Sequence, residues 1–334
     1  MDTAPDLLVV GAQGSTHVGG SLVRSDRRAV AVSPERANSA WPWLNRVVWR
    51  WRKGPPHPDR LARAILETCD RHPIRAVLVM GIAPVEAPLL ARLRQRGIAT
   101  GNFLTDDPWQ PFCRSRWLLR ALPRYDVLFT PRRANMTDLQ KLGAPSVVYL
   151  PFAYDPDLFF PVDPVPALAS DVFFAGGGDR DRVPYIAALT AAGISVGLYG
   201  GYWERFPETK PLARGMADPS TLRQAASSAK VGLCLVRRAN RDGHVMRTYE
   251  LPALGLPMVT EDTPEHRDLF GEEGTHVLYF TTPETAVAQV QRLLTDSARR
   301  QTLAQNTQRL ICSGGHTYGD RLHTMRSYLM PGTP

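Results

Sequence analysis

The sequence contains no run of 18 or more apolar residues, and a helix needs about 20 of them to span a bilayer. This absence excludes ordinary transmembrane helices. The first residues, Met1 to Asp6, lack the basic and then apolar layout of a signal peptide, so we expect a cytoplasmic protein. The four cysteines lie far apart without paired spacing, which indicates neither a zinc site nor a disulfide framework.

The chain also lacks the two commonest phosphate-binding motifs. A glycine-rich stretch, Gly11 to Gly20, follows an apolar run at 6–11, but it is neither G-x-G-x-x-G nor a Walker A sequence. Its glycines can let the backbone approach a ligand closely. A plain strand-to-helix turn explains the stretch equally well, and both interpretations stay open.

Acidic residues are scarce in the first half of the chain. Residues 1–150 contain 22 Lys and Arg against 12 Asp and Glu, a charge of +10, and the remaining residues contain 18 against 20, a charge of −2. The first half is therefore expected to meet an anionic partner or surface. Hydrophobic residues make up 43% of the chain and charged residues 22%, which is ordinary for a globular protein.

Short apolar runs alternate with helical patterns along the chain, which predicts an α/β fold of two Rossmann-like domains. In the first half, strands are expected at 29–32, 76–80, 98–104, 127–130 and 147–150. Five prolines between 151 and 169 predict an interdomain linker. We therefore expect one domain over 1–150, a second over 170–315, and a C-terminal helix over 316–334 that packs back on the first.

The stretch 231–266 carries the clearest functional signal. The apolar run at 231–236 predicts a buried parallel strand, and a helix is expected to begin near Val245 and end at Gly255. Glu250 lies on the first turns of that helix, just past the strand's carboxyl end, where open α/β sheets bind ligands. A helix N-terminus favours phosphate, and a carboxylate accepts hydrogen bonds from ribose hydroxyls. The pattern predicts a nucleotide site.

These residues resemble a known family. Asp242-x7-Glu250, followed by Leu-Pro-Ala-Leu-Gly-Leu-Pro-Met-Val-Thr, resembles the signature of retaining GT-B glycosyltransferases of the family 4 type. Arg247-Thr-Tyr-Glu250 and His316-Thr-Tyr-Gly-Asp-Arg321 resemble segments typical of the spore-maturation CgeB-like branch. The resemblance covers residues 145–330, and it departs from the common pattern by having Asp242 where Glu is usual.

The resemblance implies a GT-B fold, in which two Rossmann-like domains face each other across a cleft, the first on the acceptor side and the second binding a nucleotide sugar. It implies a hexosyltransferase-like enzyme that retains anomeric configuration and needs no metal or cofactor, with a UDP-sugar as donor. The acceptor is expected to be a small molecule, a glycan or a lipid-linked hydroxyl compound. The residues expected at the donor are Gly14, Gly176, Gly177, Arg180, Arg182, Tyr202, Arg247, Thr248, Tyr249 and Glu250, and those expected in catalysis are His17, Asp106, Asp107 and Asp242.

Two loops support these expectations from their residues. Asp106 and Asp107 follow an expected strand, where paired carboxylates suit a base or an acceptor hydroxyl, although Asp107 can equally cap the next helix. In the family a His-Asp pair stands at this place. Gly176 to Gly178 precede Arg180 and Arg182 at an expected helix start, which suits a diphosphate.

Other features of the second half leave alternatives open. Asp179-Arg-Asp181 spells the D-x-D motif of metal-dependent transferases, but a glycine loop separates it from its strand, so no metal site is expected. Tyr202 and Trp203 can stack on a base or pack within a turn. A nucleotide-sugar epimerase of GT-B fold and a non-catalytic nucleotide-binding protein fit the same pattern.

The segment from Trp41 to Lys53 has the most unusual composition. On a helix Leu44, Val47, Val48 and Trp51 share one face, and Arg46, Arg50 and Lys53 share another. Such a helix suits attachment to an anionic membrane surface, here the inner membrane face, or packing on the core. Aromatic and basic residues also bind single-stranded nucleic acid, but no nucleic-acid module accompanies them and no such partner is expected.

Overall fold

The computed structural model describes residues 4–14 and 16–332, and the chain divides into two compact units. The first unit comprises the residues up to Pro151, the short segment Ala239–Arg241, and the residues from Tyr318 onward. The second comprises Phe152–Arg238 and Asp242–Thr317. Residues Met1–Thr3, which the expectation about a signal peptide used, lie outside the described part.

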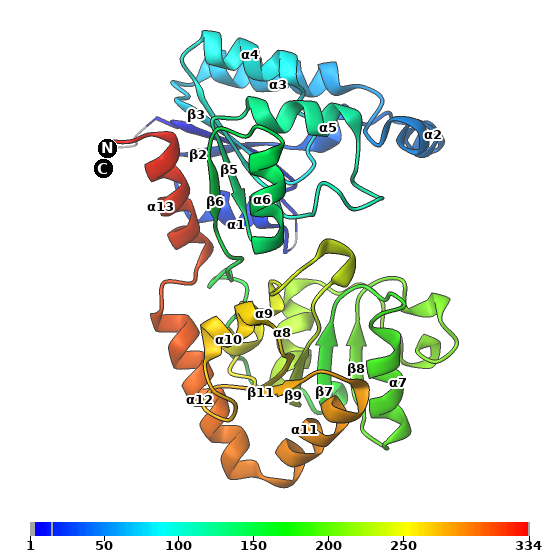
Figure 1. Cartoon of the computed structure of the whole chain (residues 1–334). Helices are drawn as coiled ribbons and strands as arrows, with labels where there is room; N and C mark the ends of the chain where they lie inside the picture. Colours follow the sequence, from blue (N-terminus) through cyan, green and yellow to red (C-terminus); the bar gives the residue numbers. More distant parts are fainter. Residues whose placement is uncertain (1–3, 15, 333–334) are drawn as a thin grey trace. The chain divides into compact units, whose positions relative to one another are not determined.

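The first unit is built on a parallel sheet of six strands in the order β2-β1-β3-β4-β5-β6 (Figure 1). The strands are β1 (Leu7–Val10), β2 (Ala29–Val32), β3 (Ala76–Met80), β4 (Ala99–Phe103), β5 (Val127–Thr130) and β6 (Val147–Tyr149). The helices are α1 (Val18–Arg24), α2 (Pro42–Arg52), α3 (Pro58–Arg71), α4 (Ala87–Gln95), α5 (Arg116–Ala121), α6 (Arg133–Lys141) and α13 (Tyr318–Leu329).

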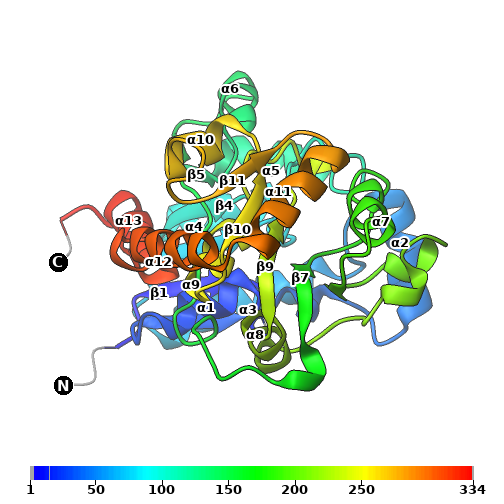
Figure 2. The ribbon, with the colours of Figure 1, turned by 90° about the horizontal axis from the view of Figure 1, so that it is seen from below.

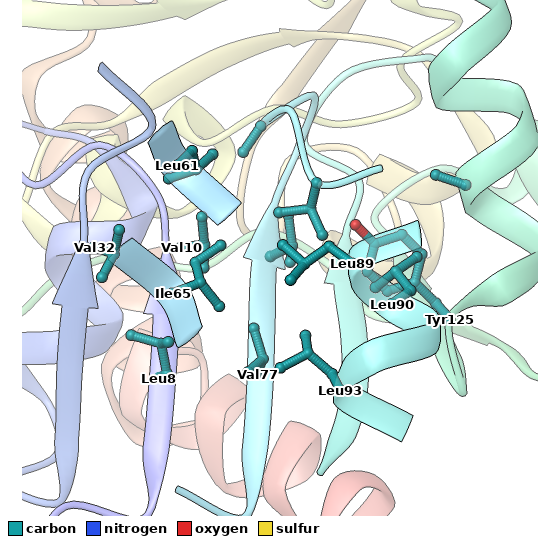
Figure 3. Packing of buried hydrophobic residues seen from close by; sticks show 14 of the residues in the cluster. Leu8, Val10, Val32, Leu61, Ile65, Val77, Leu89, Leu90, Leu93 and Tyr125 are labelled. Atoms are coloured by element: carbon teal, nitrogen blue, oxygen red, sulfur yellow. The ribbon is translucent and has the colours of Figure 1, made fainter. Parts of the chain in front are cut away.

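Helices α3 and α4 cover one face of this sheet because their apolar residues recur at helical spacing. Leu61 and Ile65 of α3 and Leu89 and Leu93 of α4 are buried against residues of β1 and β3 such as Val77 (Figure 3). Each such side chain contributes about 1.5–3 kcal/mol by leaving water. The sheet is thereby held rigid below its loops.

Helices α1 and α13 cover the opposite face. Phe129 of β5 makes an edge contact with Tyr328 of α13, at a ring-centroid distance of 5.8 Å. Arg326 of α13 donates to Asp6 before β1 at 2.8 Å and pairs with Asp26 after α1 at 2.6 Å. The first unit is therefore completed by a helix distant in sequence.

The second unit is built on a parallel sheet of five strands in the order β11-β10-β9-β7-β8. The strands are β7 (Ser170–Ala175), β8 (Val196–Tyr199), β9 (Ala229–Cys234), β10 (Met258–Glu261) and β11 (Leu278–Phe280). The helices are α7 (Val183–Ala191), α8 (Pro219–Ser227), α9 (Arg247–Ala253), α10 (Pro264–Phe270), α11 (Pro283–Thr295) and α12 (Ser297–Ser313). Figure 2 shows α7 and α11 on one side of the strands and α9 on the other.

The strand order of the second sheet places its loops. The connection from β7 leads to β8 on one side, whereas β9 lies on the other side of β7. The chain direction therefore reverses at β7 and β9, and ligands of open α/β sheets bind at the carboxyl ends of strands at such a point. The loops after β7, β8 and β9 are the ones to inspect.

The proline-rich segment 152–169 belongs to the second unit instead of forming a separate linker. Its backbone N–H groups at Val162 and Val165 donate to the hydroxyls of Ser227 and Ser228 at 3.2 and 2.8 Å. Proline lacks an N–H, so such a segment can lie against a unit with few backbone donors left to satisfy. None of the helices in residues 4–14 and 16–332 has the length and apolar character that crossing a membrane requires.

Candidate functional site

Two glycine loops meet at the carboxyl edge of the second sheet. Gly178, after β7, donates its N–H to the carbonyl of Gly201, after β8, at 2.9 Å. Gly200 has a φ of 122°, and a Cβ there would lie 2.1 Å from the carbonyl oxygen of Gly176, so only glycine fits. Trp203 is fully buried, and its indole N–H donates to the same carbonyl at 2.8 Å. Trp203 thus packs within the turn and does not offer a face to a base.

Tyr202, in contrast, is exposed beside these loops. Its side chain is 52% exposed, and its backbone adopts a left-handed conformation with φ 77° and ψ −7°. A Cβ on Gly177 would lie 3.7 Å from the tyrosine ring, and the guanidinium of Arg205 lies 4.2 Å from the ring centroid. A non-glycine residue held in this conformation costs about 1–3 kcal/mol and is often found where a ligand binds. Tyr202 is the aromatic ring placed to stack on a planar ligand.

The two arginines of the glycine loop have different environments. Arg180 is exposed, whereas Arg182 is buried. Arg182 donates through Nη1 to the carbonyl of Gly177 at 3.0 Å and through Nη2 to the carbonyl of Leu235 at 3.1 Å. Burial lowers the pKa of Arg182 from its usual value. Arg182 therefore joins the loops after β7 and β9, and Arg180 is the cation of this loop available to a ligand phosphate.

The start of α7 is already satisfied by a side chain. The Oδ1 atom of Asp179 accepts from the backbone N–H groups of Asp181 and Arg182, both at 3.0 Å. The expectation that this helix start binds phosphate by open N–H groups is therefore corrected, because Asp179 occupies them. The same contacts give Asp179 a structural role. In the part of the chain that the structure describes, no group of three His, Cys, Asp or Glu residues is placed to hold a metal ion.

Arg247 and Glu250 form an ion pair on the first turn of α9. Glu250 is almost completely buried, and Arg247 also donates through Nε to the carbonyl of Ala175, the last residue of β7, at 2.9 Å. The Arg247 guanidinium lies 5.9 Å from the ring centroid of Phe159. The sequence suggests a carboxylate open to a ligand, but the structure covers it with Arg247. A ribose can reach Glu250 only if the Arg247 side chain moves.

Thr248 and Tyr249 point into the second unit. The Thr248 hydroxyl lies 2.9 Å from Nε2 of His266, and it accepts from the backbone N–H of Val245 at 3.1 Å. Tyr249 is buried, and its ring lies 5.7 Å from that of His244 and 5.4 Å from that of His316. The expectation that both contact the nucleotide is not met by this geometry.

His266 of α10 holds the start of α9 in place, a role that sequence reasoning missed. Its Nδ1 lies 2.8 Å from the carbonyl oxygen of Glu261 and therefore carries the proton, which leaves Nε2 to accept from the Thr248 hydroxyl. Burial lowers the pKa of His266 from 6.5 to about 4. The ring is neutral, and it positions the helix that carries Arg247 and Glu250.

A second missed residue is Glu261, at the carboxyl end of β10. One of its carboxylate oxygens accepts from the backbone N–H of Val236 at 2.6 Å, and the other accepts from Arg238 at 3.1 Å. Arg238 also donates to the hydroxyl of Tyr185 at 3.1 Å. The signal was present, because a carboxylate that ends a buried parallel strand lies at the ligand-binding edge. Asp242 is half-buried in the loop after β9 and interacts electrostatically with Arg182.

In the first unit, the two carboxylates after β4 differ. Asp107 is buried and accepts two hydrogen bonds from Arg241, at 2.6 Å from Nε and 3.2 Å from Nη2. Hydrogen bonding to Asp107 raises the pKa of Arg241. Asp107 also accepts from the N–H of Trp109 at 2.9 Å. Asp106 is half-buried, and it accepts from Asn240 at 3.3 Å. Asp107 is structural here, and Asp106 is the carboxylate open to chemistry.

Gly14 and His17 lie after β1, and β3 separates β1 from β4 in the sheet. Both are exposed. His17 precedes α1 and makes no capping hydrogen bond through its side chain, and a Cβ on Gly14 would meet nothing within 4 Å. By contrast, a Cβ on Gly19 would lie 2.8 Å from the carbonyl oxygen of Ala12, so close packing explains that glycine. Gly14 and His17 remain accessible without a contact that defines their role.

The carboxyl edge of the second sheet thus brings together most of the expected donor residues. Those on its surface are Gly176, Gly177, Arg180, Tyr202 and Asp242, and those that brace it from within are Arg182, Arg247, Thr248, Tyr249 and Glu250. A rigid edge with one exposed arginine, one exposed aromatic ring and a shielded carboxylate can hold an anionic, aromatic and hydroxyl-bearing ligand.

Comparison with known proteins adds to this geometry. The family model described as "Glycosyl transferase-like" matches residues 182–327. None of the curated protein sequences compared with the chain matches it.

Solved structures resemble the whole chain. Sucrose-phosphate synthase (tll1590) from Thermosynechococcus elongatus is 12% identical with a TM-score of 0.69, covering 98% of this chain and 100% of that one. Anabaena Alr3699/HepE in complex with UDP-glucose is 14% identical with a TM-score of 0.64, covering 97% and 100%. A putative UDP-N-acetylglucosamine 2-epimerase from Listeria monocytogenes is 13% identical with a TM-score of 0.56, covering 99% and 98%. These likenesses confirm the predicted fold, GT-B with two Rossmann-like α/β units.

Proposed function

We propose that this chain is a glycosyltransferase that moves a sugar from a nucleoside diphosphate sugar to a hydroxyl acceptor. The observation that carries the proposal is the match of the glycosyltransferase-like family model over residues 182–327. That range contains α9 with Arg247 and Glu250, at the edge of the second sheet where the geometry suits a nucleotide. The CgeB-like family 4 assignment, retention of configuration and independence from metal belong to the same proposal.

The donor is a UDP-sugar held by the second unit. Tyr202 stacks on the base, Arg180 contacts the diphosphate, and the Gly176–Gly178 loop lets the phosphates come close to the backbone. The ribose displaces the Arg247 guanidinium from Glu250, which then accepts from the ribose hydroxyls. The freed guanidinium turns to the departing diphosphate, whose negative charge it stabilises.

The acceptor hydroxyl is assigned to Asp106, with His17 as a further candidate, because the Asp107 carboxylate is taken up by Arg241. Asp242 is assigned to the donor sugar. Most of the catalysis then comes from positioning the two substrates and from stabilising the leaving group.

A panel of nucleotide sugars tests the function. The true donor at about 100 times its Kd stabilises the protein by about 2.7 kcal/mol, which a thermal-shift assay detects. The stabilising compound also identifies the base. The likeness to a putative epimerase sets the second step, in which the protein is incubated with that donor alone and the sugar is identified. An epimerised sugar refutes the transferase, and a panel in which nothing binds refutes the nucleotide site.

Arg180→Ala tests the diphosphate contact. We expect the Kd for UDP to rise about tenfold, the loss of one charge-assisted hydrogen bond, while the Kd for uridine stays unchanged. Isothermal titration calorimetry measures both. Arg309→Ala, which removes an equally exposed arginine from α12, is the matched control and leaves both constants unchanged. Equal effects of Arg180→Ala on UDP and uridine would remove Arg180 from the phosphate site.

Glu250→Gln tests the ribose contact against a purely structural role. Wild type should bind UDP about 30-fold more tightly than 2′,3′-dideoxy-UDP, because one charge-assisted hydrogen bond contributes about 2 kcal/mol. The variant should bind the two ligands equally. A structural Glu250 predicts a lower melting temperature with the discrimination between the ligands intact, and that result would contradict the assignment.

A further inference from the structure

Helix α2 exposes large apolar side chains. None of its residues is buried, and Trp43, Val47 and Trp51, which recur every four residues on one stripe, are 56%, 48% and 84% exposed. Trp41, just before the helix, is 64% exposed. The structure therefore does not support the interpretation of α2 as a helix whose apolar face packs on the core.

A second segment extends this stripe. Phe112, in the loop before α5, is 60% exposed, and its ring centroid lies 5.6 Å from that of Trp49. The indole N–H of Trp117 donates to the carbonyl of Lys53, at the end of α2, at 3.1 Å. The apolar surface thus has a fixed backing in the first unit, where α2 lies at its edge in Figure 1.

The charge around this surface is of one sign. Residues 36–58 and 108–125 contain no Asp or Glu. Their basic residues are Arg36, Arg46, Arg50, Arg52, Lys53, Arg114, Arg116, Arg120 and Arg124. Arg52 pairs with Glu86, whereas Arg46 and Arg50 are exposed and form no ion pair with any residue that the structure describes.

This combination points to one kind of partner. Tryptophan side chains favour the interface between lipid headgroups and acyl chains, where an apolar ring and an N–H are both accommodated. Arginines beside them attract anionic headgroups, and a helix with both features lies in the plane of the interface. An exposed aromatic stripe bordered only by cations complements the surface of an anionic bilayer.

We propose that the surface formed by Trp41, Trp43, Arg46, Val47, Arg50, Trp51 and Phe112, the α2 surface, binds reversibly to bilayers that contain anionic lipid. The helix lies parallel to the membrane, with its tryptophans at the level of the headgroups. This inference does not depend on the proposed enzymatic function. If both hold, a lipid-linked acceptor is within reach of the first unit.

Co-sedimentation with vesicles tests the proposal. Wild type should sediment with vesicles of phosphatidylcholine and phosphatidylglycerol, stay in solution with phosphatidylcholine alone, and be released by salt. Lipids brominated on the acyl chain should quench its tryptophan fluorescence. Arg46→Glu/Arg50→Glu should lower the partition coefficient about tenfold or more, and Trp43→Ala/Trp51→Ala should remove the quenching.

Arg60→Glu/Arg63→Glu is the matched control, because it makes the same change in net charge on exposed positions of α3. It should sediment like wild type, and circular dichroism verifies that every variant is folded. Equal losses from the two charge reversals would mean attraction by net charge alone and would overturn the proposal. It also fails if wild type ignores both vesicles, including the case where it binds a single-stranded oligonucleotide through α2 instead.

Discussion

Arg241→Ala is expected to lower the free energy of unfolding of the first unit by about 3 kcal/mol, because it leaves the buried Asp107 carboxylate without its charged partner. Arg241 also donates to Asp138 at 2.8 Å and to Asn135 at 3.0 Å, and both contacts are lost. Urea denaturation measures the change. Of the seven tryptophans only Trp203 belongs to the second unit, so tryptophan fluorescence reports mainly on the first.

A double-mutant cycle separates this pair from other effects of the substitution. Asp107→Asn removes the buried charge, so Arg241→Ala/Asp107→Asn should be more stable than the sum of the two single changes predicts. Additive changes would mean that the carboxylate and the guanidinium are not coupled. If Arg241→Ala loses less than about 1 kcal/mol, the usual value for an exposed ion pair, the burial of Asp107 has no energetic consequence.

His266 should make the protein lose about 3 kcal/mol of stability as the pH falls from 6.5 to 4, because each unit of pKa difference is worth about 1.4 kcal/mol. Burial depresses the pKa in the folded protein to about 4, while the unfolded chain keeps the usual value of 6.5. The unfolded chain therefore binds the proton first. The contribution is complete above pH 6.5, is lost as the pH falls toward 4, and then stays constant.

Comparison with His266→Gln isolates this effect, because carboxyl groups that also titrate at low pH are common to both proteins. The difference between their unfolding free energies, followed by circular dichroism in urea from pH 4 to pH 8, should rise with pH and level off above pH 6.5. A difference that is flat across this range would show that His266 titrates normally in the folded protein.

Patterns of apolar residues predicted the sheets well. The strands expected at 29–32, 76–80 and 127–130 coincide with β2, β3 and β5. Parallel strands covered on both faces need continuous apolar runs, and such runs are visible in a single sequence. The resemblance of the second half to glycosyltransferases added the fold, since alternation alone does not distinguish one pair of Rossmann-like units from another.

Burial of individual side chains could not be predicted in the same way. Tyr202 and Trp203 are adjacent, yet one is exposed and the other is buried, because a left-handed backbone at Tyr202 turns the chain between them. Arg180 and Arg182 differ for a similar reason, since Asp179 shapes the loop around them. These differences depend on backbone angles that residue types alone do not fix.

Long-range partners were also beyond the sequence. Asp107 and Arg241 lie 134 positions apart, and Arg241 belongs to a segment of three residues that joins the first unit. Nothing in the local pattern of either residue names the other. Glu261 was within reach, because a carboxylate at the carboxyl end of an apolar strand deserves the same notice as Glu250 received.

The pairing of Asp6 with Arg326 bears on how the protein is made. These residues are 320 positions apart, so a ribosome that adds about 5–20 residues per second needs on the order of tens of seconds between them. During that time the face of the first sheet that α13 covers has no partner, and Phe129 of β5 awaits Tyr328. The nascent chain therefore carries an open apolar sheet face through most of its synthesis, which makes it a natural client for a chaperone.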